Sequence, residues 1–282
     1  MTPSWTVVTV TYNSVQHLRR HWAQGSDWRP FNWVVVDNSS TDDSSDYAES
    51  KSARVIKNEH NIGFAAANNL GLDAVDTEYV AFVNPDVTVP ADDWGVLLAE
   101  TIKDTGGFVA PQLLSADHSE QLNARGFPFL SAKIRNRIAP ASKLAQNYAR
   151  GGFSTPTFCV WVMGAAIGGR TEDFRRIGGW NSRYFLYYED HDLGLRAWKA
   201  GIPVVLDPRV RWVHDWQRET TGPNLRAWRA ELASMWTFYT TYPEFFPCMR
   251  PRRLVLAKPN ESRFGLASRK VWKPVSDGYE QD

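Results

Sequence analysis

Cysteine is scarce in this sequence, which contains only Cys159 and Cys248 among its 282 residues. Two cysteines cannot build the disulfide framework of a small secreted domain, although they do not exclude a single bond. A chain of this length has enough residues to bury a core as one large domain or two small ones. We therefore expect a folded protein of the reducing cytoplasm.

Long apolar runs are also missing. No stretch reaches the roughly 18 apolar residues of a transmembrane helix. Residues 1–10 lack both the basic start and the apolar centre of a signal peptide. We expect a soluble cytoplasmic protein, with a peripheral contact at the inner face of the membrane left open.

Charge of one sign is not in excess, because 32 Lys and Arg stand against 31 Asp and Glu, for a formal net charge of +1. No overall field attracts the protein to nucleic acid, so we expect no nucleic-acid partner. Basic residues do gather after Pro243, in a tail that we expect to be irregular. This tail is either a solvated end or a contact for anionic lipid headgroups.

The first half of the chain alternates short apolar runs with helical patterns, which predicts a parallel sheet covered by helices. Helices start near Ser14, a possible N-cap, and Gly63. The predicted strands are residues 5–11, 33–36, 54–57 and 79–83. In such sheets, ligands bind beyond the carboxyl ends of the strands, where Tyr12, Asp37 and residues 84–86 fall.

The second half is less regular. We predict helices from Thr171 and at residues 189–200, the latter ended by Gly201. The predicted strands are residues 108–114, 158–163, 165–169, 204–206 and 210–214. Residues 115–152 indicate a loop or short helices. Residues 225–242 form an amphipathic pattern whose large side chains we assign to the core, namely Trp228, Leu232, Met235, Trp236 and Tyr239.

Three small groups of residues suggest chemistry only when they are taken together. The acids of residues 189–192 begin a predicted helix, where acids also favour the positive helix end. Asn-Pro-Asp at residues 84–86 is also an ordinary turn sequence, and a lone histidine such as His214 is more often a satisfied structural group. In combination, they offer a carboxylate base beside a site for a divalent cation.

Five segments occur in a fixed order: VTVTYNS at 8–14, VVDNSSTD at 35–42, NIGFAAANN at 61–69, FVNPD at 82–86 and FLYYEDHDL at 185–193. Together they resemble glycosyltransferase family 2, especially its rhamnosyltransferase-like branch, over about residues 5–220. The resemblance implies the α/β GT-A fold, a Rossmann-like, mainly parallel sheet flanked by helices. It also implies a catalytic domain at residues 1–220, with a nucleotide-sugar half at about 1–110 and an acceptor half at 111–220. A C-terminal helix and basic tail at 221–282 would extend from it.

The resemblance implies binding roles for eight residues of the nucleotide half: Thr11, Tyr12, Asp37, Asn61, Gly63, Asn68, Asn84 and Pro85. Asp37 would accept a hydrogen bond from the imide nitrogen of uracil or thymine, which neutral cytosine lacks. Gly63 would permit a close backbone approach beside the nucleoside. In the alternative interpretation, this glycine only serves a turn and the alanines after it only pack a helix on the sheet.

The resemblance also assigns a divalent metal, Mg²⁺ or Mn²⁺, to Asp86 and His214. Asp86 matches the last acid of the family's Asp-x-Asp signature, and Asn84 occupies the first position. With one carboxylate fewer, the donor diphosphate must supply much of the ligand field. An imidazole ligand is more natural for Mn²⁺ than for Mg²⁺.

Asp190 matches the family's catalytic base, and an unperturbed aspartate with a pKa near 3.9 is ionised at neutral pH. Glu189 would help to position the acceptor. Asp192 and Arg196 have the spacing of a structural helix pair. The resemblance places Trp161, Gly164 and Trp180 near the donor and acceptor sugars, with Trp180 either stacked on a sugar or part of the core.

We therefore expect an inverting, metal-dependent glycosyltransferase. Its donor would be a dTDP- or UDP-sugar, with dTDP-L-rhamnose the best single choice, and its acceptor a glycan or lipid-linked glycan of bacterial cell-wall or surface polysaccharide. Two other classes compete. A sugar-1-phosphate nucleotidyltransferase requires a glycine-rich phosphate loop near the start, which residues 10–15 lack. A non-catalytic sugar-nucleotide-binding protein would not need the acids at 189–192, and turnover would exclude it.

Overall fold

The first half of the chain folds as alternating strands and helices. The computed structural model describes residues 3–23, 30–139, 148–216, 225–246 and 275. This half contains β1 (Trp5–Thr11), α1 (Val15–His21), β2 (Asn32–Asp37), α2 (Ser44–Ser50), β3 (Arg54–Lys57), α3 (Phe64–Asp73) and β4 (Tyr79–Val83). The four predicted strands and the two predicted helices are confirmed, and α2 is an additional helix.

The second half contains more and shorter elements. They are β5 (Val87–Thr88), α4 (Trp94–Thr105), β6 (Phe108–Leu114), β7 (Ala124–Arg125), α5 (Leu130–Ile138), β8 (Ala149–Arg150), β9 (Thr157–Cys159), β10 (Trp161–Val162), β11 (Ala166–Arg170), α7 (Thr171–Arg176), α8 (Glu189–Lys199), β12 (Val204–His214), α9 (Leu225–Thr241) and the 3₁₀ helix η3 (Pro243–Phe245). The apolar run predicted as one strand at 158–163 is divided between β9 and β10.

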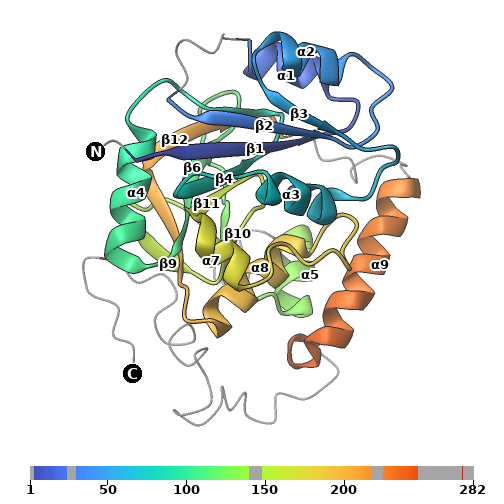
Figure 1. The fold of residues 1–282 in the computed structure, drawn as a ribbon. Coiled ribbons are helices and arrows are strands. Elements are labelled where there is room, and N and C mark those ends of the chain that lie inside the picture. The colour runs from blue at the N-terminus through green and yellow to red at the C-terminus, as the bar shows by residue number, and fades with distance from the viewer. Residues whose placement is uncertain (1–2, 24–29, 140–147, 217–224, 247–274, 276–282) are drawn as a thin grey trace.

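A mixed sheet forms the centre of the molecule (Figure 1). In the described residues it has nine strands, in the order β3-β2-β1-β4-β11-β6-β12-β5, with β9 paired to β12. The strands β3, β2, β1 and β4 are parallel, and β11 runs antiparallel between β4 and β6. Because β2, β1 and β4 are parallel neighbours, the polar residues that follow them meet at one edge of the sheet.

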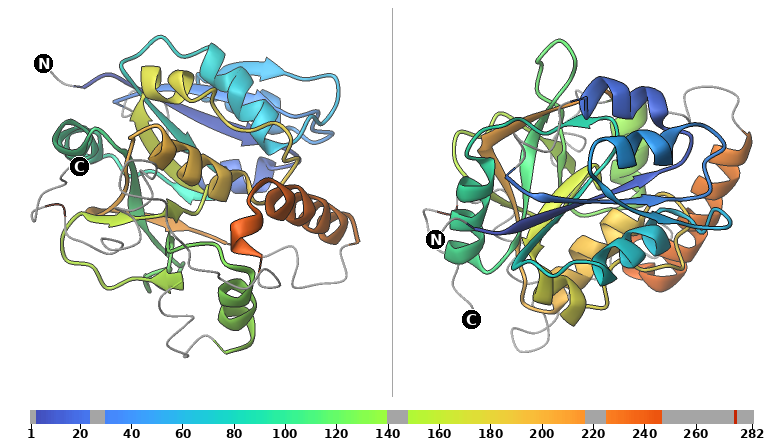
Figure 2. Two further views of the ribbon diagram at one scale, coloured as in Figure 1. Left: turned by 90° about the horizontal axis from the view of Figure 1, so that it is seen from below. Right: turned by 45° about the horizontal axis from the view of Figure 1, so that its top comes forward.

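Helices cover both faces of this sheet, with α1 and α2 on one side and α3 and α8 on the other (Figures 1 and 2). β4 and β6 are buried along their whole length, and their sequences are apolar apart from Gln112 in β6. On α3, Ala65 and Ala67 are fully buried, and a Cβ on Gly71 would lie 2.3 Å from Val8 Cγ1. The small residues of α3 therefore allow the close helix–sheet packing that the sequence predicts.

A second cluster of buried aromatic residues joins α9 to the helix α8. Its members include Trp161, Tyr188, Phe238 and Tyr242. The Tyr242 hydroxyl donates a hydrogen bond to Asp192 Oδ1 at 2.9 Å. α9 is therefore held against the helix that begins with the acidic segment.

Two predictions about local structure are wrong. Residues 204–214 form one strand rather than two, because β12 continues through Pro208 with a register shift between Asp207 and Arg211. Ser14 precedes α1 but makes no side-chain cap; Asp42 Oδ2 instead accepts a hydrogen bond from Val15 N at 3.1 Å. A carboxylate from the loop after β2 thus satisfies the N–H of the first helical residue, whereas Ser14 holds the predicted N-cap position without a side-chain bond to the helix.

The assignment of the α9 side chains to the core is right for Tyr239, which is 7% exposed, but wrong for two others. Leu232 is 53% exposed and Trp236 is 74% exposed. The described side chains that α9 buries are Ser234, Phe238 and Tyr239, and Tyr242 directly after the helix is also buried. The predicted basic tail lies outside the described residues, apart from its first few positions up to 246 and Val275.

Candidate active site

Thr11 and Asp37 lie side by side at the carboxyl ends of β1 and β2, where they are register partners. The Thr11 hydroxyl donates to Asp37 Oδ1 at 2.9 Å, and Ser40 N donates to Asp37 Oδ2 at 3.1 Å. Both side chains are buried, whereas Tyr12 is half exposed at the next position. The carboxylate is fixed in place, and Tyr12 presents an aromatic face at the same edge.

Asparagine side chains organise the loop between β3 and α3. Asn38 Nδ2 donates to Asn61 Oδ1 at 2.8 Å, and Gly63 N donates to the same oxygen at 2.9 Å. Gly63 has a φ of 87°, and a Cβ there would lie 2.7 Å from the carbonyl oxygen of Phe185. Gly63 is therefore required because its backbone lies close to the loop before α8. Asn68 is buried within α3 and donates to Phe64 O.

The turn after β4 is held by backbone contacts on three sides. Asn84 N donates to Ala165 O at 2.9 Å, and the Trp22 indole donates to Pro85 O at 3.1 Å. Asp215 N donates to Asp86 O at 2.9 Å. The last contact joins the turn to the end of β12 and brings the imidazole of His214, the residue before Asp215, close to Asp86.

Asp86 and His214 form a pair whose hydrogen bonding suits a metal. His214 Nε2 lies 3.5 Å from Asp86 Oδ2. Gln121 Nε2 donates to the His214 carbonyl at 2.9 Å, so Gln121 Oε1 is left to accept from His214 Nδ1 at 2.8 Å. This arrangement leaves the Nε2 lone pair directed at Asp86.

Asp86 Oδ1 is buried and has no hydrogen-bond partner. An unpartnered carboxylate oxygen beside an imidazole lone pair fits a divalent cation. Among the described residues, no group of three or more His, Cys, Asp and Glu side chains is arranged to hold a metal. The remaining ligands would therefore come from a bound diphosphate or from water.

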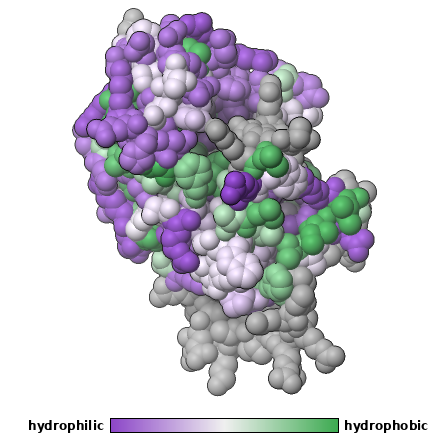
Figure 3. Space-filling view, turned by 90° about the vertical axis from the view of Figure 1, so that its right-hand side faces the viewer, coloured by the Kyte–Doolittle hydropathy of each residue, from purple (hydrophilic) through white to green (hydrophobic). Residues whose placement is uncertain are grey.

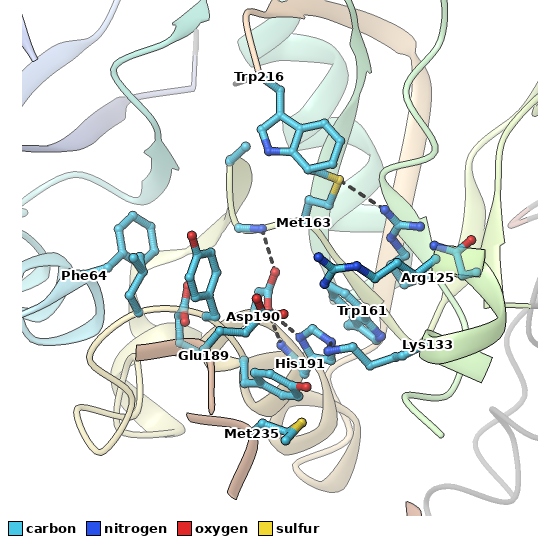
Figure 4. A pocket seen from close by; sticks show the side chains of 18 of the residues that line it. Phe64, Arg125, Lys133, Trp161, Met163, Glu189, Asp190, His191, Trp216 and Met235 are labelled. Carbon is cyan, nitrogen blue, oxygen red and sulfur yellow. Dashed lines mark hydrogen bonds and ion pairs between the residues drawn. The ribbon is translucent and has the colours of Figure 1, made fainter. Parts of the chain in front are cut away.

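A cavity of about 580 Å³ brings the three predicted groups together. Asp86 and His214 line it, and so do Glu189 and Asp190. Figure 4 shows Asp190 between the labelled side chains Phe64 and Glu189 and those of Lys133 and Trp161. Segments far apart in the sequence thus converge on one space large enough for sugar groups.

Asp190 reaches this cavity while most of its surface is buried. Its Oδ1 accepts hydrogen bonds from His191 N at 2.8 Å and from His191 Nδ1 at 2.6 Å. Its Oδ2 accepts from Gly164 N at 3.3 Å. Burial alone would raise the pKa of Asp190, but the interactions with His191 and the charge of Lys133 outweigh it and lower this pKa. Asp190 is therefore ionised at neutral pH.

His191 is the centre of a buried chain of contacts that ends at Asp190. Its ring stacks on Trp161 with a centroid distance of 3.6 Å, and its Nε2 lies 3.1 Å from Lys133 Nζ. Burial, reinforced by the charge of Lys133, lowers the pKa of His191 to about 4. A neutral imidazole can accept from Lys133 and donate to Asp190 at the same time.

Glu189 differs from its neighbour Asp190. It is 6% exposed, and its Oε2 has no hydrogen-bond partner. Burial, followed by the negative charge of Asp190, raises the pKa of Glu189 well above its usual value. Two adjacent carboxyl groups therefore have opposite protonation tendencies, and Glu189 offers a hydrogen-bonding group beside the ionised one.

Asp192 supports the structure, as its spacing with Arg196 predicts. It is 1% exposed and accepts a hydrogen bond from Arg196 Nε at 2.6 Å. The same guanidinium donates to Ile177 O and Gly179 O. Asp192 therefore fixes the loop before α8 and does not face the cavity.

The three residues predicted near the sugars have different positions. Trp161 and Gly164 line the cavity. Trp180 does not line it; this side chain is 1% exposed and packs edge-to-face on Phe64 and Phe82. Asn69 accepts from Trp180 N and donates to Trp180 O, each at 2.8 Å, which fixes it from α3. Of the two roles considered for Trp180, the structure shows the one in the core.

Several residues that line the cavity are absent from the sequence-based prediction. They include Arg125, Lys133, Tyr148, Trp228, Glu231 and Met235. Lys133 lies 58 positions before His191 in the chain, within a segment that has few periodic signals. The signal that could have marked this short segment as helical is the spacing of Leu130, Ile134 and Ile138, which recur every four residues in α5.

Comparison with known proteins identifies the family of this chain. The family model described as "Glycosyl transferase family 2" matches residues 6–163. The chain belongs to glycosyltransferase family 2. As a member of this family, it is an enzyme that transfers a sugar from a nucleotide-sugar donor. Among the described residues, no helix combines the length and apolar character needed to cross a membrane.

Relatives of this family 2 enzyme include two rhamnosyltransferases. The N-acetylglucosaminyl-diphospho-decaprenol L-rhamnosyltransferase of Mycobacterium tuberculosis is 29% identical over 240 residues, which cover 76% of each chain. The rhamnosyltransferase WbbL of Escherichia coli is 26% identical over 186 residues, or 62% of this chain and 69% of that protein. The pre-mycofactocin glycosyltransferase of M. tuberculosis is 31% identical over 81% of this chain and 45% of its own length.

Solved structures confirm the GT-A fold of the family 2 enzyme. GalNAc-T7 with UDP, GalNAc and Mn²⁺ matches with a TM-score of 0.56 and 15% identity, over 95% of this chain and 55% of that one. This chain thus spans about half the length of that structure. Mannosyltransferase PcManGT from Pyrobaculum calidifontis, with GDP-Man and Mn²⁺, has a TM-score of 0.55 and 18% identity, over 99% and 77%.

Proposed function

We propose that this enzyme is an inverting, metal-dependent rhamnosyltransferase that uses dTDP-L-rhamnose and a lipid-linked glycan acceptor. Asp190 is its base, and Asp86 and His214 are its metal ligands. The observation that carries the proposal is that these three side chains line one cavity although they come from the β4–β5 turn, α8 and β12.

In the proposed reaction, the acceptor hydroxyl attacks the anomeric carbon of the donor sugar in a single displacement. The proton of this hydroxyl passes to the Asp190 carboxylate as the new C–O bond forms and the bond to the nucleoside diphosphate breaks. Asp86 and His214 would hold a divalent cation, which stabilises the charge of the departing diphosphate. Gly164 and His191 orient the base through their hydrogen bonds to its two oxygens.

The lowered pKa of Asp190 supports its role as the proton acceptor. Glu189, whose pKa is raised, keeps a proton to higher pH and can donate a hydrogen bond to a sugar hydroxyl. Asp37, fixed by Thr11, suits the imide N–H of thymine or uracil. Rhamnose and the lipid-linked acceptor are proposed because two of the relatives named above are rhamnosyltransferases, and the name of one of them includes a diphospho-decaprenol compound.

A panel of nucleotide sugars tests the donor. The purified protein is incubated with dTDP-L-rhamnose, UDP-GlcNAc, UDP-galactofuranose and GDP-mannose, with Mn²⁺, with Mg²⁺ or with a chelator. We expect release of dTDP from dTDP-L-rhamnose alone, and only with a metal. Preferential turnover of a UDP-sugar would replace rhamnose in the proposal, and equal turnover in the chelator would refute the metal site.

A further inference from the structure

Large hydrophobic side chains are exposed in an unusual concentration on α5 and α9. Ile134 and Ile138 on α5 are 50% and 71% exposed; Leu225, Leu232 and Trp236 on α9 are 77%, 53% and 74% exposed. These are five of the eleven large hydrophobic residues that are exposed in the described part of the chain. Such a concentration marks an interaction surface rather than scattered surface residues.

The exposed hydrophobic side chains of both helices begin at the edge of the active-site cavity. Ile134 and Leu232 line this cavity, and Ile138 and Trp236 lie one helical turn further along their helices. The Arg137 guanidinium lies 5.0 Å from the centre of the Trp228 ring, which connects the two helices. The α5–α9 surface consists of Ile134, Ile138, Leu225, Leu232 and Trp236 together with Arg135, Arg137 and Arg229.

The charge of this surface is positive. Arg135, Arg137 and Arg229 are exposed, and the two helices contain one acid, Glu231, which is half-buried and lines the cavity. Figure 3 faces this side of the molecule and shows hydrophobic side chains next to hydrophilic ones across its middle and right. A second copy of the chain would bring the same positive charge to the interface, whereas an anionic lipid surface complements it.

We propose that the α5–α9 surface docks on a bilayer that contains anionic phospholipid. Trp236 and Ile138 enter the headgroup region, and Arg135 contacts lipid phosphates. This placement extends the proposed function, because it holds the cavity mouth at the level where the hydroxyl of a lipid-linked acceptor is found. The link to a lipid-linked acceptor rests on the proposed function, whereas the binding of vesicles requires neither donor nor acceptor.

Vesicle co-sedimentation of the full chain tests the proposal. The vesicles are phosphatidylcholine alone or phosphatidylcholine mixed with phosphatidylglycerol. One variant combines Ile138→Ala and Trp236→Ala, and a second carries Arg135→Glu; none of these residues lines the cavity. The matched controls are Val96→Ala and Lys103→Glu on α4, at the opposite side of the molecule (Figure 1).

We expect the wild-type protein and both α4 controls to bind the mixed vesicles and not those of phosphatidylcholine. Arg135→Glu should weaken this binding by about tenfold or more, because each basic side chain adds roughly a factor of five at an anionic surface and this variant changes the charge by two units. The double variant Ile138→Ala/Trp236→Ala should weaken binding to the mixed vesicles to a similar extent. All variants should still release dTDP from dTDP-L-rhamnose.

Wild-type protein that stays in the supernatant with both vesicle types would overturn the docking proposal, even if the donor panel succeeds. Equal loss of binding in the α4 controls would overturn it as well, since it would show a non-specific charge effect. A dimer that Ile138→Ala/Trp236→Ala converts to a monomer, without vesicle binding, would assign the surface to a second copy. A failed donor panel with normal vesicle binding would refute the proposed reaction and leave the docking surface intact.

Discussion

The Asp190 carboxylate is ionised although it is largely buried, and its interactions with His191 stabilise the charge. The imidazole donates to Asp190 Oδ1 and is itself held between Trp161 and Lys133. The same histidine stands beside Arg125 and Tyr188, so its surroundings are both cationic and aromatic. We infer that His191 positions the proposed base and lowers its pKa.

Replacement of His191 should therefore change the pH dependence of transfer. His191→Phe keeps a ring against Trp161 but removes the hydrogen bond to Asp190. We expect kcat to fall by roughly tenfold, because a misplaced base loses part of its catalytic contribution of about 10²–10⁴. The pKa of Asp190 should rise, so the acidic limb of the kcat/KM profile should move to higher pH.

The conservative variant His191→Asn serves as the comparison. Its amide can donate from near the position of Nδ1, so it should recover part of the activity and part of the original pH profile. Both variants should bind the donor normally. An unchanged acidic limb in His191→Phe would show that His191 has only a packing role.

Sequence alone points to the proposed base, Asp190, but not to the residues that contact it. Asp190 belongs to a recognisable acidic segment, whereas Lys133 lies in a stretch whose pattern gives no hint of a contact with His191. The protonation difference between Glu189 and Asp190 is likewise invisible in the sequence, because burial and hydrogen bonds create it.

At the scale of elements, the start of α8 depends on its contact with α3. Tyr187 and Tyr188 precede α8 with φ values of 70° and 68°, an uncommon conformation for residues other than glycine. Phe64 N at the start of α3 donates to Phe185 O at 2.8 Å, and Gly63 makes this close approach possible. α3 therefore helps to hold the loop that aims the acidic segment.

Gly63→Ala tests this contact against a matched glycine. Alanine would be strained at a φ of 87° and would meet the Phe185 backbone, so we expect about 2–4 kcal/mol of lost stability and a large loss of activity. Gly106 has a similar φ of 62° with no atom within 4 Å of an added Cβ, so Gly106→Ala should cost only about 1 kcal/mol. Denaturant unfolding measures the stability of both variants, and equal losses of stability in Gly63→Ala and Gly106→Ala would refute the contact.

Element prediction succeeds where burial and periodicity agree. β1 and β4 are nearly or fully buried, and their apolar runs locate them correctly. The helix α9 is also predicted correctly, but the burial of its side chains is not, because a helix that is partly buried and partly an apolar surface has the same residue pattern as a core helix. Trp236 illustrates this, since its type suggests the core and its 74% exposure shows otherwise.

At the scale of the whole molecule, the order of the strands brings the proposed metal ligands and the proposed base together. β12 carries His214 to the β4–β5 turn by pairing with β5, in the register His214↔Val87. α8 supplies Asp190 from one face of the same sheet. Sequence order cannot show this meeting, because β11 and β12 are inserted between strands that precede them in the chain.

The metal pair should act as one unit in nucleotide binding. Asp86→Ala and His214→Ala should each weaken Mn²⁺-dependent dTDP affinity by on the order of tenfold, because each removes a ligand of the same ion. The double variant should lose less than the sum of the two changes. Calorimetry with and without Mn²⁺ measures this, with Asp73→Ala, an exposed acid on α3, as the control. Full additivity, or equal losses without metal, would contradict a shared ion.

The most direct test of the whole account is the behaviour of Asp190→Asn, with Asp73→Asn as its matched control. In one preparation, donor affinity and sugar transfer are measured with the donor that the panel selects. We predict that Asp190→Asn keeps its donor affinity within about twofold and loses transfer by on the order of 10²–10⁴, as expected for a missing base. Transfer at the wild-type rate by Asp190→Asn would contradict the account.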